Sequence, residues 1–204
     1  MAQFLSFLTR ASGIVAMVLI VLAVADGLIF SGREGGRRLR PAWWMDLHRG
    51  LGGYALAFTG LHLLTAYGAG LGLSIATMVI PNASSISTTA YTLGVLAVYA
   101  MAIVVFSSWP KRRLPRKLWH VLHVLSIPAA LAAAVHGWHL GTDATSPWYM
   151  ALTVALTGLA TYPLVLRVSG IARRRAGRSA QVATTAPATD PHHSDDRVLV
   201  DAGV

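Results

Sequence analysis

The sequence predicts an all-α integral membrane protein, a bundle of about five transmembrane helices. Hydrophobic residues make up 54% of the 204 residues and charged residues only 12%, about half the share found in soluble domains. The mean hydropathy is +0.56, and a soluble protein of this size could not bury so much apolar surface. Apolar stretches also recur along the chain at the length of a membrane-spanning helix.

Each of the five segments has close to the ~20 apolar residues that a transmembrane helix needs. We expect them at about 11–30, 44–67, 90–108, 118–140 and 148–168. A polar, uncharged loop at 68–89 separates the second segment from the third, and a short interfacial helix is expected within it at 71–80. The bundle is expected to occupy residues 1–169. Residues 170–204 become rich in Ala, Thr, Pro and Asp, which predicts a disordered cytoplasmic tail.

Basic residues give the predicted orientation. Lys and Arg gather after the first, third and fifth segments, whereas the opposite side has only Arg10. The positive-inside rule then predicts an N-out, C-in protein of the cytoplasmic membrane, with multiple passes. The net charge of +9 is explained by these clusters, so nucleic acid is not an expected partner. In this topology the second and fourth segments run in parallel from inside to outside.

Those two segments carry six of the eight histidines. Imidazole is costly in hydrocarbon unless it is bonded to a partner. His48 and His62 are 14 residues apart, or ~21 Å along a helix, and His123 and His136 are 13 apart, or ~20 Å. On parallel helices, equal spacing means equal depth. The sequence therefore predicts one pair, His48 and His123, near the cytoplasmic face and another, His62 and His136, near the outer face.

In an ideal helix, His123 and His136 would not lie on the same face of the fourth segment. A 13-residue step misses a whole number of turns by ~140° in an ideal helix. Pro128 lies between His123 and His136 and is expected to kink or unwind the helix. The rival pairings with His120 or His139 fit the depth of the second segment less well.

Each pair offers two neutral imidazoles to one iron, so we expect a haem at each site. With no open axial position, such sites suit electron transfer rather than oxygen binding. The chain has no cysteine, which excludes iron–sulfur clusters, thiolate-ligated haem and the covalent attachment of c-type haem. Two alternatives stay open. The histidines could only hydrogen-bond neighbouring helices of a haem-free scaffold or partner-binding subunit. A metal or proton carrier is the other, although the helices offer only Asp26 and Asp46 as carboxylates.

Several residues are candidates for supporting roles. Arg49 could contact the propionates of the inner haem and Arg10 those of the outer haem, although either also fits an ordinary charge meeting lipid headgroups. Asp26, near the inner end of the first segment, could pair with Arg49 or snorkel to water, and of the two we expect a structural ion pair. Four positions near the histidines of the second segment are glycines and so have no side chain: Gly50, Gly52, Gly53 and Gly60. Their small size allows close helix packing or leaves room for a macrocycle.

The stretches LHRGLGGYALAFTGLHLLTAY and LWHVLHVLSIPAALAAAVHGW resemble the ferric reductase-like transmembrane domain family. That family includes ferric reductases, NADPH oxidases and the haem-bearing subunit of the methionine-sulfoxide reductase system. The resemblance covers about residues 10–165 and is greatest to compact actinobacterial members. It implies b-type haems held by His48, His62, His123 and His136, and it leaves His120 and His139 outside the motif.

Two departures from that family bear on the electron donor. Larger members have six helices, and enzyme members add a flavin and nicotinamide domain. Here no GxGxxG motif follows a strand, and the tail is too short for such a fold. We therefore expect no flavin on this chain, but a cytoplasmic flavoprotein or quinone as donor and an unidentified extracytoplasmic acceptor. The expected function is that of a di-haem electron-transfer component of an oxidoreductase.

Overall fold

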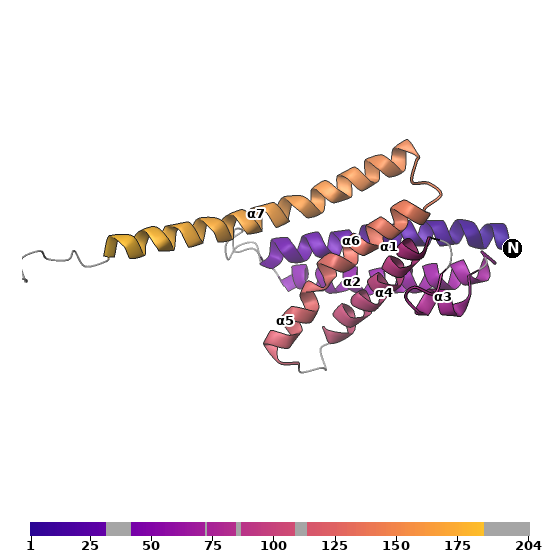
Figure 1. The fold of residues 1–204 in the computed structure, drawn as a ribbon, viewed down its shortest axis with the longest axis horizontal. Coiled ribbons are helices and arrows are strands. Elements are labelled where there is room, and N and C mark those ends of the chain that lie inside the picture. Colours follow the sequence, from indigo (N-terminus) through magenta and orange to yellow (C-terminus); the bar gives the residue numbers. More distant parts are fainter. Residues whose placement is uncertain (32–41, 72, 85–86, 109–113, 186–204) are drawn as a thin grey trace, which may run out of the picture. The chain divides into compact units, whose positions relative to one another are not determined.

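The computed structural model describes residues 1–31, 42–71, 73–84, 87–108 and 114–185, and over these residues it is helical, without strands. Figure 1 labels the helices α1 (Ala2–Ser31), α2 (Ala42–Gly68), α3 (Ile75–Val79), α4 (Thr88–Ser107), α5 (Arg116–Val124), α6 (Ser126–Leu140) and α7 (Pro147–Thr185). The chain divides into two compact units, Met1–Val165 and Leu166–Val204. Helix α7 begins in the first unit and continues into the second.

The protein is a helical membrane bundle, as predicted. Within the described residues, four stretches are long and apolar enough to cross a bilayer: Ala2–Phe30, Thr88–Ser107, Arg116–Leu140 and Pro147–Arg178. Helix α2 has 27 residues, which is sufficient length. It is less apolar because it contains several glycines, two histidines and the charged residues Asp46 and Arg49. The N-out, C-in orientation stays a prediction.

Exposed side chains of the first unit fit a lipid surrounding. Leu64 and Val154 are each 73% exposed, and Leu131 and Val121 are also well exposed. Large apolar residues in such number on a surface indicate contact with another apolar phase. In this bundle that phase is the hydrocarbon of the bilayer.

The stretch predicted as one helix at 118–140 is broken into α5 and α6. Helix α5 ends at Val124, α6 begins at Ser126, and Leu125 joins them. Pro128 has no N–H to donate to the carbonyl of Val124, four residues earlier, and its ring crowds that carbonyl. The predicted local unwinding before Pro128 is therefore confirmed.

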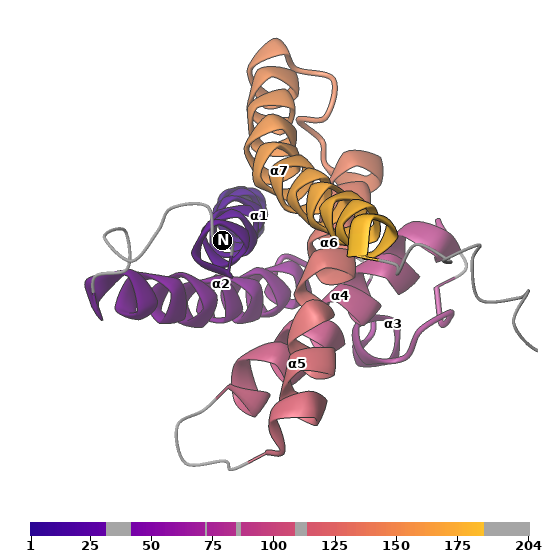
Figure 2. The ribbon, with the colours of Figure 1, turned by 90° about the vertical axis from the view of Figure 1, so that its left-hand side faces the viewer.

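Two helical hairpins form the part of the fold that holds the histidines. Figure 1 shows α1 beside α2 and α4 beside α6, and these are the most extensive helix contacts. Smaller contacts join α1 to α6 and α2 to α4. Figure 2 also shows α3 close to α4, which it contacts. The short helix expected at 71–80 is thus present as α3, although it covers only Ile75–Val79.

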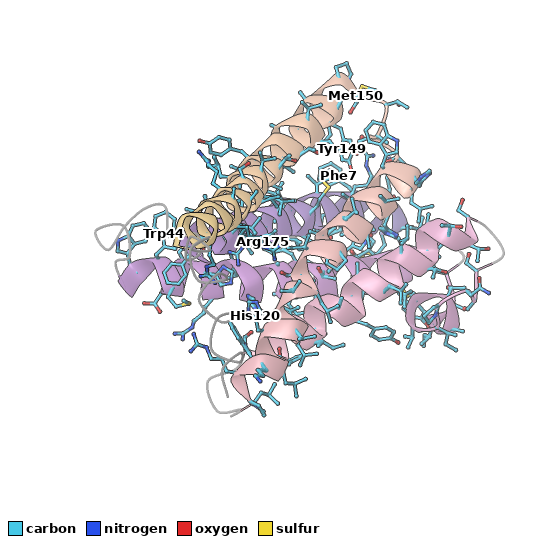
Figure 3. The ribbon with its side chains drawn as sticks, turned by 60° about the vertical axis from the view of Figure 1, so that its left-hand side comes forward. Phe7, Trp44, His120, Tyr149, Met150 and Arg175 are labelled. Atoms are coloured by element: carbon cyan, nitrogen blue, oxygen red, sulfur yellow. The ribbon has the colours of Figure 1, made fainter. Side chains whose placement is uncertain are left out.

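The first half of α7 contacts α1. Tyr149 and Leu156 join Met17 and Val21 in one apolar cluster, and Figure 3 labels Tyr149 on the first turn of α7. The helix continues to Thr185. Residues 170–185 of the expected disordered tail are therefore helical, because the sequence stays rich in Ala and Arg, good helix formers, to that point. Residues 186–204 lie outside the described part.

Candidate functional site

The structure brings the four candidate histidines together as two pairs. The ring centroids of His48 and His123 are 5.8 Å apart, with an interplanar angle of 54°. Those of His62 and His136 are 6.4 Å apart, at 87°. These are the pairings that equal depth on parallel helices predicted. His120 and His139 are exposed and belong to neither pair; Figure 3 labels His120 on α5.

In the His62–His136 pair, each ring is fixed by a main-chain carbonyl of the other helix in its hairpin. His62 Nδ1 lies 2.8 Å from the carbonyl oxygen of Thr9 on α1. His136 Nδ1 lies 2.8 Å from that of Ala90 on α4. A carbonyl only accepts, so Nδ1 is the protonated nitrogen in both neutral rings. The lone pair of each ring is then on Nε2, the atom available to a metal.

Glycines make room for three of the four rings. A Cβ at Gly13 would lie 2.8 Å from His62 Nδ1, and one at Gly94 would lie 2.5 Å from His136 Nδ1. A Cβ at Gly27 would lie 2.9 Å from His48 Cε1. Real Cβ atoms almost never come this close to another heavy atom. The rings therefore occupy space that only glycine leaves free.

The surroundings of His48 are different, because its neighbour on α1 is a carboxylate. His48 Nδ1 lies 3.2 Å from Asp26 Oδ2, and Asp26 is buried. The indole Nε1 of Trp44 faces the same carboxylate, and Figure 3 labels Trp44 near the start of α2. Neither nitrogen reaches hydrogen-bond geometry with Asp26. The carboxylate and the imidazole are nonetheless close enough for an ion pair or, after a small ring rotation, a hydrogen bond.

His123 is fixed by a tryptophan and a serine. Trp119 stacks on its ring, with centroids 4.7 Å apart and an interplanar angle of 19°. The hydroxyl oxygen of Ser108 lies 3.3 Å from His123 Nδ1. Trp119 Nε1 donates to the same hydroxyl over 3.3 Å. This network holds the ring at the beginning of the α5–α6 stretch.

The two hairpins repeat the same intervals. Fourteen residues separate Gly13 from Gly27 on α1, and fourteen separate Gly94 on α4 from Ser108, the residue that caps the end of α4. Each of these four positions lies beside a different one of the four histidine rings. A tryptophan also precedes one histidine by four residues in each hairpin: Trp44 before His48, and Trp119 before His123. Each hairpin thus supplies one histidine to each pair from matching positions.

The supporting glycines are not those singled out from the sequence. A Cβ at Gly50, Gly53 or Gly60 would meet nothing within 4 Å, and one at Gly52 would only reach 3.9 Å from Val105. Close helix packing therefore does not explain them, and the space beside them is open. Gly13, Gly27 and Gly94 were missed. For Gly13 and Gly27, the sequence feature that could have identified them is their 14-residue spacing, which equals the spacing of His48 and His62.

The two candidate arginines both have carboxylate partners. Arg10 forms a bidentate ion pair with Asp143, with Nε donating to Oδ2 over 2.9 Å. Arg49 lies 3.7 Å from Asp46, and both are well exposed. The expected pair between Asp26 and Arg49 is therefore wrong, because Asp26 faces His48 across the hairpin. Contacts from either arginine to a propionate stay a prediction.

Each pair offers two nitrogen donors. Within the described parts of the chain, no point is surrounded by three or more His, Asp or Glu side chains in a metal-binding arrangement. A bare transition metal in a protein is usually held by at least three side chains. A metal held by either pair alone would therefore need further ligands of its own.

Fold and site together define a multi-pass helical membrane protein with two histidine pairs stacked along parallel helices. The chain belongs to the ferric reductase-like transmembrane component family, which it matches over residues 10–134. The match includes three of the four paired histidines and ends two residues before His136. Membership gives the chain a role in membrane electron transfer, and domains of this family generally bind haem. Searches of curated proteins and of solved structures gave no match.

Proposed function

We propose that the protein carries electrons across the membrane through two b-type haems. His48 and His123 would hold one haem, and His62 and His136 the other. Electrons would come from a cytoplasmic flavoprotein or quinone and reach an extracytoplasmic acceptor. The observation that carries the proposal is the separation of the paired rings.

Bis-histidine ligation fits these separations. Metal–imidazole bonds are ~2.0 Å long, so two imidazoles on opposite sides of one iron have ring centroids roughly 6 Å apart. The observed values are 5.8 and 6.4 Å. Direct ring stacking or a direct hydrogen bond between the imidazoles would bring the centroids closer, whereas an edge-to-face contact spans the same distances. In the His62–His136 pair, the Nδ1–H groups are also occupied by carbonyls, which leaves Nε2 for a ligand bond.

The donor set and the spacing support electron transfer. An iron porphyrin brings four nitrogen donors and supplies reversible one-electron redox chemistry, so two side chains complete its coordination. With two histidines holding each haem, no position on the iron would remain for oxygen or water. The 14 residues between His48 and His62 separate the pairs by ~21 Å along α2, a large part of the ~30 Å hydrocarbon core.

Electron transport across a sealed membrane tests this function. The purified protein, expressed with ample haem, is placed in liposomes that contain ferricyanide, and dithionite is added outside. We expect trapped ferricyanide to be reduced with wild-type protein and with His139→Ala, but not with His136→Ala. A protein that shows no reduced b-type absorption band and transfers no electrons would instead be a haem-free scaffold, in which the histidines only join helices.

A further inference from the structure

We propose that Asp26 makes the two haem sites unequal, by lowering the reduction potential of the haem between His48 and His123. This inference rests on the proposed haem ligation. It assigns to Asp26 the role of a positioning and tuning residue that acts through His48. It goes beyond the proposed function because that function requires two haems but not a difference between them.

The four histidines differ in what their Nδ1 atoms face. His62 and His136 face neutral backbone carbonyls, and His123 faces the neutral hydroxyl of Ser108. His48 alone faces a carboxylate, at 3.2 Å. Asp26 is only 8% exposed, and no Lys or Arg of the described residues pairs with it. A buried carboxylate is therefore adjacent to one ligand of one site.

The repeat between the hairpins isolates this difference. Gly27 on α1 and Ser108 at the end of α4 follow Gly13 and Gly94 by the same 14 residues and lie beside His48 and His123, so the position that corresponds to Asp26 is Ser107. The Ser107 hydroxyl donates to the carbonyl of Val104 in its own helix and faces no histidine. The two hairpins thus differ by one carboxyl group beside His48, which carries a negative charge when it is ionised.

Such a charge affects the redox equilibrium in a known direction. Reduction of ferric to ferrous iron adds one electron, which a nearby carboxylate opposes electrostatically. After the small ring rotation that would let Asp26 accept the Nδ1–H of His48, the carboxylate would also make the imidazole a stronger donor, and this favours the ferric state. Both effects are larger in a low-dielectric interior than in water. In the predicted N-out orientation, electrons would then pass from the lower-potential site on the cytoplasmic side to the higher-potential site.

Potentiometric titration of the purified protein, followed by b-type absorption, tests the inference. The variant is Asp26→Asn, which keeps the shape and an acceptor oxygen but removes the charge. The matched control is Asp46→Asn, which removes the same charge from an exposed position on α2. We expect the Asp26 variant to raise the lower midpoint potential by at least ~59 mV, which for one electron is a tenfold change in the equilibrium constant of reduction. The higher potential and the control should not move.

A His62→Ala background assigns the shifted haem, because only the His48–His123 site remains there. Ser108→Asp gives a second test in the opposite direction, since it places a carboxylate beside His123. We expect it to lower the same potential further, and it keeps the inference testable if Asp26→Asn does not accumulate. If these variants bind two haems whose potentials are unshifted, the role of Asp26 is overturned while the proposed haem ligation stands. A wild-type protein without haem would overturn the proposed function itself.

Discussion

His136 Nδ1 lies 2.8 Å from the carbonyl oxygen of Ala90, in the space left by Gly94. Across the pair, His62 has the same relationship to Thr9, with Gly13 leaving the space. In both cases the glycine follows the accepting residue by four positions, one helical turn along the same face. Because the acceptor is main chain, no substitution of its side chain removes the bond. The glycine is the position at which it can be broken.

We expect Gly94→Ala to weaken haem retention at the His62–His136 site by about 10- to 100-fold, the usual effect of disturbing a partner of a metal ligand. The new Cβ would lie 2.5 Å from His136 Nδ1, so the ring must move and lose its carbonyl. Haem titration into the apoprotein measures the affinity.

Gly158→Ala is the matched control, because a Cβ there meets nothing within 4 Å and α7 carries none of the four paired histidines. It should bind haem as the wild type does, and a Gly-to-Ala change in a helix should stabilise it by ~0.5–1 kcal/mol. Equal haem affinity in the two alanine variants would contradict the role of Gly94.

The ion pair of Arg10 and Asp143 separates two roles of the arginine. Each single substitution, Arg10→Ala or Asp143→Asn, should cost about 0.2–1 kcal/mol of stability, because the pair is partly exposed. A double-mutant cycle in thermal unfolding measures the coupling. If Arg10 also contacts a propionate, only Arg10→Ala should reduce haem affinity. Equal haem affinity in both variants would mean that the arginine acts only in the ion pair.

Trp119→Ala should loosen His123 and reduce haem retention at the His48–His123 site. The substitution removes a stacked ring worth ~0.5–1.5 kcal/mol and the N–H that donates to Ser108. Trp119→Phe keeps the stacking and should restore most of the retention. Trp138→Ala, at an exposed position on α6, serves as control. The measurement is the rate of haem transfer to apomyoglobin, and a rate unchanged in Trp119→Ala would refute this role.

Pro128→Ala should let α5 and α6 join into one helix. A continuous helix turns His136 away from the face of His123 by ~140°, so one site should lose its haem while helix content is kept. Pro163→Ala, in the interior of α7, is the control. Circular dichroism and haem content are measured together. Retention of both haems in a fully helical Pro128→Ala protein would show that the break is not needed.

The sequence predicted the helices and the histidine pairs because both follow from periodicity and depth. Apolar length gives the crossings, basic loops give parallel directions, and equal spacing pairs His62 with His136. The Pro128 break was predictable for the same reason, since the 13-residue step needs it.

The surroundings of the rings were not predictable in this way. A glycine in an apolar helix has many uses, and Gly94 acquires its role only when α6 packs on α4. Asp26 was assigned to Arg49 because opposite charges attract along neighbouring segments. The hairpin instead places it against His48, and Arg49 points to Asp46. These contacts depend on the rotation of each helix about its axis, which apolar patterning hardly specifies in a lipid-exposed bundle.

Haem stoichiometry across single histidine variants tests the central claim most directly. The pyridine haemochrome of purified protein should give two b haems per chain for the wild type, His120→Ala and His139→Ala. His48→Ala and His123→Ala should each retain the same single haem, and His62→Ala and His136→Ala should each retain the other one. Variants that lose haem in different combinations, or that all keep two, would contradict the pairing on which this account is built.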